Sequence, residues 1–194
     1  MKRLGKIGAL ALLLAVAGTV ALSPQALAGV PITPQEAAAL LGDTVAAPRI
    51  STTSGLAQGR KYFYRTAAPM SKHGRTGVLV VILYSAKTMA GYDGVFKTPK
   101  EVFGHMMKAK RIAEKRSGKK VAVEAPGIGD QAFWEPSAHT LHFMAHGAYV
   151  RVKIDDLKKI TAGNRAELDN KIAAHRRWLA EKAAKLIIPR LGAL

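Results

Sequence analysis

Cysteine is absent from the 194-residue chain. The sequence therefore excludes a disulfide framework, a thiolate zinc site, a paired redox motif and a lipid-modified N-terminal cysteine. Acidic residues are also scarce, with 13 Asp and Glu against 30 Lys and Arg, and aromatic residues make up 6% of the chain. Hydrophobic residues make up 48%, which is too high a fraction for a disordered protein. These numbers indicate one basic globular domain of modest size.

Residues 1–28 have the pattern of a secretory signal peptide. A basic segment, Lys2–Lys6, precedes an apolar run over residues 7–22, and residues 26–28 read Ala-Leu-Ala, as leader peptidase requires. An uncleaved membrane anchor is the alternative, but the apolar run is shorter than the roughly 20 residues that span a bilayer. We therefore expect a mature domain over residues 29–194, periplasmic or secreted, with no transmembrane segment.

Positive charge is concentrated in two parts of the chain. Residues 97–120 carry nine Lys or Arg against two Glu, and residues 151–194 carry eleven against five acids. Residues 121–150 carry three acids and no Lys or Arg. A polarised basic protein outside the cytoplasm attracts anionic polymers and lipid headgroups. The alternative is that these charges only keep the protein soluble.

Two segments share one helix-start signature, and strand-like segments follow each. Residues 33–36 and 98–101 both read Thr-Pro-x-Glu, in which Thr caps the helix and Glu completes a capping box. Amphipathic helices are predicted after Thr98 and over about 164–188. Strands are predicted over residues 61–66, 77–84, 119–124, 131–135, 139–145 and 148–154. This order predicts an α+β fold, an antiparallel sheet with amphipathic helices packed on it, with two helix-plus-strands repeats as a further hypothesis.

The segment 126–154 predicts a three-stranded meander together with its register. A two-residue turn at 146–147 and a three-residue loop at 136–138 place apolar residues together on one face. The facing pairs are Phe143 with Val150, Leu141 with Val152, and Phe133 with Leu141.

The opposite face of this meander supplies the first candidate ligand-binding residues. Aromatic rings beside cations suit an anionic or ring-bearing ligand. The alternative is that a helix covers this face and leaves the cations at its margin. The candidates are Trp134, His142, Tyr149, Arg151 and Lys153.

The histidines of this segment do not predict a metal site. His139 and His142 point to opposite faces, and Arg151 lies opposite His142, where it repels a cation. We therefore expect no metal and no cofactor.

The helix after Thr98 supplies a candidate anion-binding surface. Its cations share the arc opposite the apolar residues, so they are expected on the solvent side. The alternative is that they contribute only to solubility. They are Lys100, Lys108, Arg111 and Lys115.

Catalytic motifs are absent. The turn at Pro126–Asp130 lacks the Lys-Ser/Thr of a phosphate loop, and the chain contains neither HExxH nor GxSxG. Its few carboxylates are scattered along the sequence, so the sequence does not identify a pair of catalytic carboxylates such as glycosidases use. The sequence leaves enzymatic activity undecided and favours a non-catalytic role.

The run PGIGDQAFW, followed by the hairpin LHFMAHGAYVRVKI, resembles small exported bacterial proteins of unknown function. The resemblance covers most of the mature chain and implies an α+β domain with a binding or accessory role and no catalytic residues. The lipoprotein members of this group carry a cysteine to which lipid is attached, and this chain has no cysteine. Its absence favours a soluble form. The leading hypothesis is thus an exported accessory domain that binds a periplasmic or cell-envelope protein or an anionic ligand. The alternatives are a binder of polyanions or anionic membrane surfaces, and a periplasmic enzyme without a recognisable motif.

Overall fold

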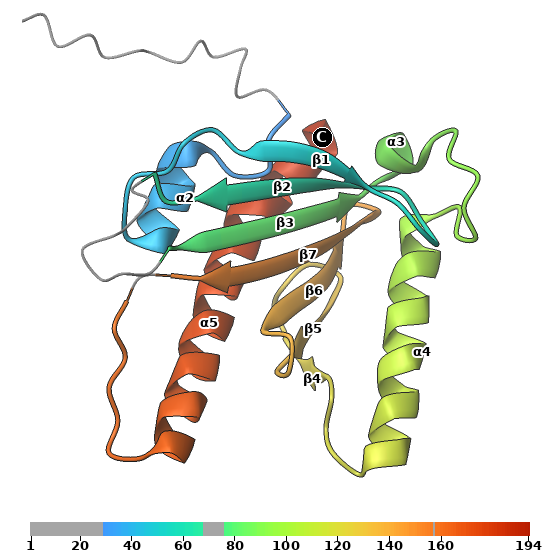
Figure 1. The fold of residues 1–194 in the computed structure, drawn as a ribbon. Coiled ribbons are helices and arrows are strands. Elements are labelled where there is room, and N and C mark those ends of the chain that lie inside the picture. Colours follow the sequence, from blue (N-terminus) through green and yellow to red (C-terminus); the bar gives the residue numbers. More distant parts are fainter. Residues whose placement is uncertain (1–28, 68–75, 157) are drawn as a thin grey trace, which may run out of the picture.

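Seven antiparallel strands form one sheet in the order β1-β2-β3-β7-β6-β5-β4, with helices on both faces (Figure 1). The computed structural model describes residues 29–67, 76–156 and 158–194, so the expected signal peptide lies outside the described residues. The elements are α2 (Pro34–Leu41), β1 (Arg49–Thr53), β2 (Gly59–Arg65), β3 (Val78–Tyr84), α3 (Ala86–Met89), α4 (Pro99–Ser117), β4 (Val123–Glu124), β5 (Gln131–Glu135), β6 (Thr140–Ala145), β7 (Ala148–Asp155), α5 (Arg165–Ile187) and the 3-10 helix η1 (Ile188–Ala193). The predicted α+β fold is confirmed.

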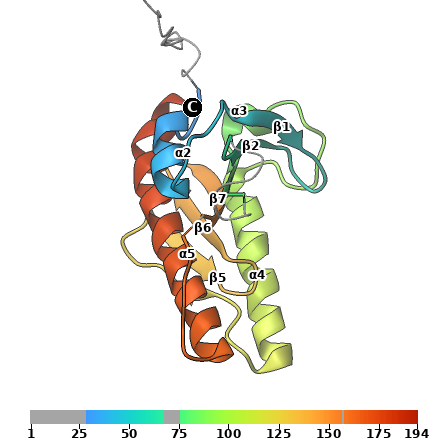
Figure 2. The same cartoon turned by 60° about the vertical axis from the view of Figure 1, so that its left-hand side comes forward.

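Both predicted capping boxes are present, at Thr33 before α2 and at Thr98 before α4. The strands β1-β2-β3 and β7-β6-β5-β4 form two meanders that meet where β3 pairs with β7. Each meander follows a capped helix, as a repeat of one unit requires. The two helices lie on opposite faces of the sheet, however, because α2 packs beside α5, and α4 packs on the other side, where the short helix α3 contributes Met89 to the same cluster (Figure 2).

The larger core lies between the sheet and the helices α2, α5 and η1. Phe143 and Val152 of the sheet and Ile187 of α5 are completely buried there. Alternate residues of β2, β3, β6 and β7 point to this side, as the alternation of buried and less buried residues in β2 and β3 shows. Arg190 of η1 ties the C-terminus to α2 through two hydrogen bonds to the Glu36 carboxylate, of 2.6 and 2.7 Å. This pairing lowers the pKa of Glu36 to about 2, although burial acts in the opposite direction.

A smaller core lies beneath α4. Phe103 packs against Phe133 and Tyr149, with ring centres 5.7 and 5.5 Å apart, and Tyr149 stacks on Tyr84 at 5.3 Å. Met107 is half-buried at the edge of the same cluster. One end of this face of the sheet is thereby closed by a helix.

The register of the β6–β7 hairpin is confirmed, and the predicted register of β5 is wrong by one residue. Phe143 pairs with Val150 and Leu141 with Val152, as predicted. The loop between β5 and β6 has four residues, Pro136–His139, rather than three, because His139 adopts a left-handed conformation (φ 48°) and joins the turn. Leu141 therefore pairs with Trp134 rather than Phe133, and the two aromatic side chains exchange faces.

Candidate functional site

The face of the sheet that carries α4 is covered at only one end. α4 lies over Phe133, Met144 and Tyr149, whereas in Figure 1 no described element lies in front of the β1-β2-β3 side. The strand register gathers one set of side chains on this uncovered part, which we call the open face. It comprises Arg49, Lys61, Phe63, Arg65, Val78, Val80, Ile82, Arg151 and Lys153.

Cations surround an apolar centre on the open face. The cross-strand pairs form one row of Arg49, Phe63, Val80 and Lys153, and a second row of Lys61, Ile82 and Arg151. In each row the apolar side chains lie in the middle strands, and they are partly exposed. Arg49, Arg65 and Lys153 at the margins are exposed. The open face thus combines positive charge with apolar surface, in four different strands.

The cations of the open face have no acidic partner in the described parts of the chain. None of the five side chains forms an ion pair or a hydrogen bond there. The Lys61 ammonium lies 5.8 Å from the centre of the Phe63 ring. The carboxylate that shares this face, Asp155, is bonded to Arg176 at 2.8 Å. The positive charge of the open face is therefore available to a ligand.

Arg151 lies at the border between the open face and α4. Its Nε atom is buried and has no hydrogen-bond partner among the described residues. A buried polar group without a partner is unfavourable, so a ligand oxygen that accepts from Arg151 would be favoured. Its cross-strand neighbour His142 has a lowered pKa, mainly because it is buried and in part because Arg151 is positively charged.

Two of the five predicted ligand-binding residues, Arg151 and Lys153, lie on the open face. His142 and Tyr149 point to the same side of the sheet but are completely buried beneath α4. Trp134 points to the opposite side and is buried in the larger core, which corrects its predicted placement. The reason is the extra residue in the loop after β5. The predicted outer face is therefore divided, with one half covered by a helix and the other half open.

A chain of polar side chains runs beneath α4. Lys110 of α4 forms an ion pair with Glu135, and the other oxygen of Glu135 lies 3.2 Å from His142 Nε2. His142 Nδ1 lies 2.7 Å from the Tyr149 hydroxyl. All four groups are satisfied when His142 is neutral and donates from Nε2 to Glu135 while Tyr149 donates to Nδ1.

The acid–base properties of the hydrogen-bonded series from Lys110 to Tyr149 fit a structural role. The hydrogen bond from His142, together with Lys110, lowers the pKa of Glu135 to about 2 against the effect of burial. Burial raises the pKa of the Tyr149 hydroxyl. Because His142 and Tyr149 are inaccessible to solvent, no substrate can reach them in this structure. This series of hydrogen bonds holds α4 on the sheet.

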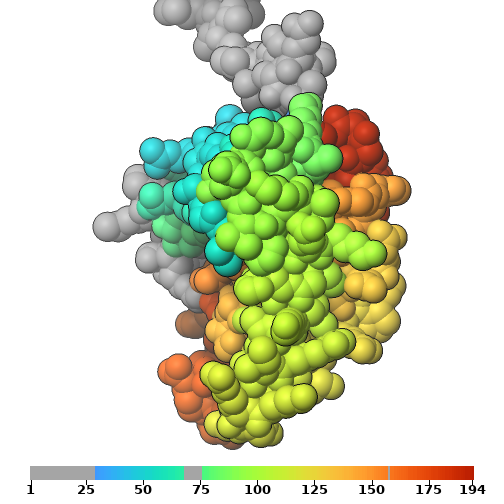
Figure 3. All heavy atoms as spheres, turned by 90° about the vertical axis from the view of Figure 1, so that its right-hand side faces the viewer, coloured from blue at the N-terminus to red at the C-terminus, as the bar shows by residue number. Residues whose placement is uncertain are grey.

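The four predicted cations of α4 are all exposed, on the solvent side of the helix. Two of them, Lys100 and Arg111, line hollows between α4 and β5, and Lys108 and Lys115 do not. Within the described segments, the side chains of these four residues form no ion pair and no hydrogen bond. In Figure 3, α4 forms a ridge with β1 and β2 on one side and β4 and β5 on the other.

The two other histidines of the meander, His139 and His146, lie apart from each other and have different surroundings. His139 Nδ1 accepts a hydrogen bond from Arg176 at 2.8 Å, and His146 lies in the β6–β7 turn with φ 48°. Within the described residues, no three His, Asp or Glu side chains lie close enough to hold a metal ion.

Comparison with protein-family models, curated proteins and solved structures finds no match to this chain. In the described ranges, no helix combines the length and the hydropathy needed to cross a membrane. The site must therefore be interpreted from its own geometry and charge.

Proposed function

We propose that this protein is an exported binding protein whose open face holds a linear anionic polymer. The observation that carries the proposal is the group of five unpaired cations around the apolar stripe of Phe63, Val80 and Ile82. Phosphate, sulfate or carboxylate groups can pair with the cations, and the apolar stripe can contact rings or the less polar faces of the polymer. The open face carries no free carboxylate or imidazole within the described residues, so the proposal is binding rather than catalysis.

The shape of this surface favours a polymer over a membrane. α4 stands on the same side of the sheet as the open face (Figure 2), and a helix with its side chains is about 10 Å across. This ridge would hold a flat bilayer away from the sheet. A polymer strand can lie beside the helix and contact β1, β2, β3 and β7 together.

The test is charge reversal of the three exposed cations, in the variant R49E/R65E/K153E. Wild-type protein should bind heparin or single-stranded DNA with an affinity that falls about twenty- to hundredfold between about 50 and 200 mM salt, as three to five contacts imply. The variant should lose most of this binding and its salt dependence. Its thermal stability should change little, because exposed charges contribute little to folding. Fluorescence anisotropy at several salt concentrations measures the binding.

The control reverses the four α4 cations, in the variant K100E/K108E/R111E/K115E. This variant removes more positive charge than the first but leaves the open face unchanged, so it should retain most of the polymer binding. Loss of binding in the α4 variant alone would assign the polymer to α4 instead. Stronger binding to anionic vesicles than to either polymer would favour a membrane surface. Absence of binding to all three probes would overturn the proposal.

Export is part of the same proposal and concerns residues outside the described part of the chain. If residues 1–28 are a signal peptide, intact-mass analysis of the protein from the periplasm or the medium should give a chain that begins at Gly29. Recovery of the full-length chain in the membrane fraction would contradict cleavage.

A further inference from the structure

Three hollows lie end to end between α4 and the segment from β4 to β5. The central hollow has a volume of about 350 Å³ and shares Phe103 and Asp130 with a hollow of about 410 Å³ toward the start of α4. It shares Met107 and Arg111 with a hollow of about 510 Å³ toward the end of α4. Together they form one elongated depression, which we call the α4 groove. It lies on the side of α4 that faces β4 and β5 and is separate from the open face (Figure 3).

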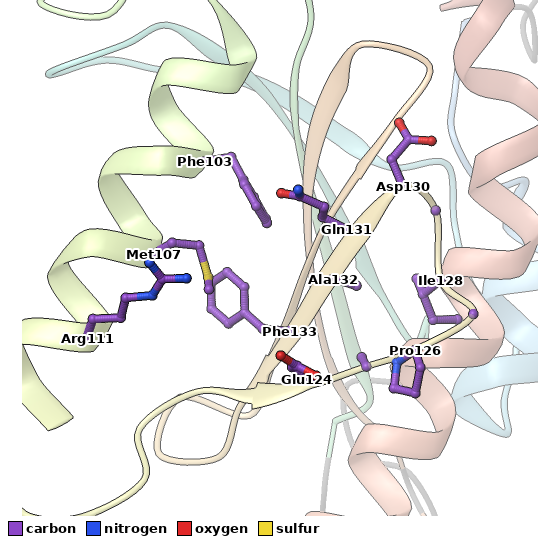
Figure 4. A pocket seen from close by; sticks show the side chains of 13 residues that line it. Phe103, Met107, Arg111, Glu124, Pro126, Ile128, Asp130, Gln131, Ala132 and Phe133 are labelled. Carbon is purple, nitrogen blue, oxygen red and sulfur yellow. The ribbon is translucent and has the colours of Figure 1, made fainter.

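The floor of the α4 groove is apolar. Phe103 and Met107 reach it from the helix and Phe133 from β5, and Figure 4 shows Met107 and Phe133 next to each other. Pockets that bind organic ligands combine such a floor with a few polar groups and have volumes of roughly 300–1,000 Å³. Each of the three hollows of the α4 groove has a volume in this range, and the central one has this composition.

The turn of the PGIGDQAFW segment builds the wall opposite α4. Ile128 anchors this turn in the larger core, where it is only 4% exposed. Gly129 adopts φ 56°, and a Cβ at this position would lie 2.2 Å from the Met144 carbonyl oxygen. The Asp130 amide donates to the same oxygen at 2.7 Å. The glycine thus lets the turn dock against β6 and holds Asp130 at the groove.

The two walls carry opposite charges. Lys100 and Arg111 lie on the helix wall, and Asp130 and Glu124 lie on the opposite wall. Within the described residues, none of these four side chains forms an ion pair. A ligand that carries both signs of charge would satisfy both walls, whereas a purely anionic ligand would face the two carboxylates.

We propose that the α4 groove binds a short extended peptide with apolar side chains. The side chains would contact Phe103, Met107 and Phe133. The carboxylate and amino termini would pair with Arg111 and with the acidic wall. α4 has 19 residues and is therefore about 28 Å long, which is enough for several residues of extended chain. A fatty acid fits less well, because it carries no positive charge for Asp130 or Glu124.

The test is calorimetric titration with trileucine, with acetyl-trileucine amide, which lacks both terminal charges, and with dodecanoate. Trileucine should bind saturably and more tightly than the blocked peptide. R111Q and D130N should each weaken trileucine binding roughly fivefold, the effect expected of a partly exposed ion pair. Neither variant should change the affinity for the blocked peptide, because it offers no terminal charge.

Two methionines of α4 provide a matched control. M107A removes part of the groove floor and should weaken the binding of both peptides by a similar factor. M106A removes the same atoms from the neighbouring position, which packs against the same core but does not line the groove, and should leave binding unchanged. Tighter binding of dodecanoate than of trileucine, or no saturable binding of trileucine, would overturn the proposal. These outcomes are independent of the polymer test, which concerns the other side of α4.

Discussion

Replacing Glu135 with leucine should lower the free energy of unfolding by about 3 kcal/mol, because Lys110 and His142 lose their common partner beneath α4. The His142 side chain has no exposed surface and that of Lys110 is 17% exposed, so water can compensate the loss only at Lys110. Urea denaturation at pH 7, with wild-type protein as the reference, measures the difference.

The double variant K110M/E135L distinguishes loss of an ion pair from loss of packing. Replacing both partners with apolar side chains removes the buried charge, so the double variant should be at least about 1 kcal/mol more stable than E135L alone. If the double variant is no more stable than E135L, the unpaired charge of Lys110 is not the reason why E135L loses stability. The substitution of Lys110 by methionine should not itself change the stability of α4, because Met and Lys have similar helix propensities.

The contribution of Glu135 should also depend on pH. Its pKa is lowered in the folded protein to about 2, from 4.5. The stabilisation is therefore fully present above about pH 4.5 and is lost as the pH falls toward 2. The stability difference between wild-type protein and E135L should shrink over this range. In the wild-type protein, the pKa of His142 is lowered from 6.5, mainly by burial, so stability also falls as the pH drops below about 6.5, because the unfolded chain takes up a proton at this residue more readily than the folded chain.

Local patterns in the sequence were sufficient to predict the capped helices and the β6–β7 hairpin. In each case residues close in the chain determine the structure: Thr98 and Glu101 at the start of α4, and His146 and Gly147 in a two-residue turn. The β5–β6 loop shows the limit of this approach. A single additional turn residue, His139, exchanged the faces of Phe133 and Trp134. Nothing in the local pattern distinguishes a three-residue loop from a four-residue loop there.

The open face was predicted only in part, because it depends on pairing between distant strands. Arg151 and Lys153 were identified from β7, but Arg49, Lys61 and Arg65 come from β1 and β2. β1 was not predicted at all, since its residues are mostly exposed and polar. The spacing of Lys61, Phe63 and Arg65 at every second residue, which places them on one face of a strand, is the signal that was available. It does not indicate which strand lies alongside.

The chain from Lys110 to Tyr149 and the α4 groove were not predicted, for a related reason. Lys110 resembles the other cations of α4 in the sequence, and only the placement of the helix on β5 and β6 directs it inward toward Glu135. The sequence of the turn at Pro126–Asp130 excludes a phosphate loop, but the role of this turn in building the wall of the α4 groove depends on the contact between Gly129 and β6. Such contacts are tertiary and carry no local pattern.

Replacing Gly129 with alanine should therefore have one of the largest effects on this protein. The added Cβ would lie 2.2 Å from the Met144 carbonyl oxygen, a distance that backbone atoms cannot tolerate. The turn would have to move away from β6, which would break the 2.7 Å hydrogen bond from the Asp130 amide to the same oxygen. With the strain of a left-handed alanine added, we expect a loss of about 3 kcal/mol or more in the free energy of unfolding. Chemical denaturation monitored by tryptophan fluorescence measures it.

Gly127 is the matched control, two residues earlier in the same turn. It also has a positive φ, of 77°, but a Cβ there would meet no atom within 4 Å. G127A should therefore cost only about 1 kcal/mol, from backbone conformation alone. Equal losses in the two variants would mean that φ, and not the contact with Met144, governs the turn. A specific effect at Gly129 would also carry over to ligand binding, because moving the turn displaces Asp130 from the α4 groove. Folded G129A should then bind trileucine less tightly than G127A.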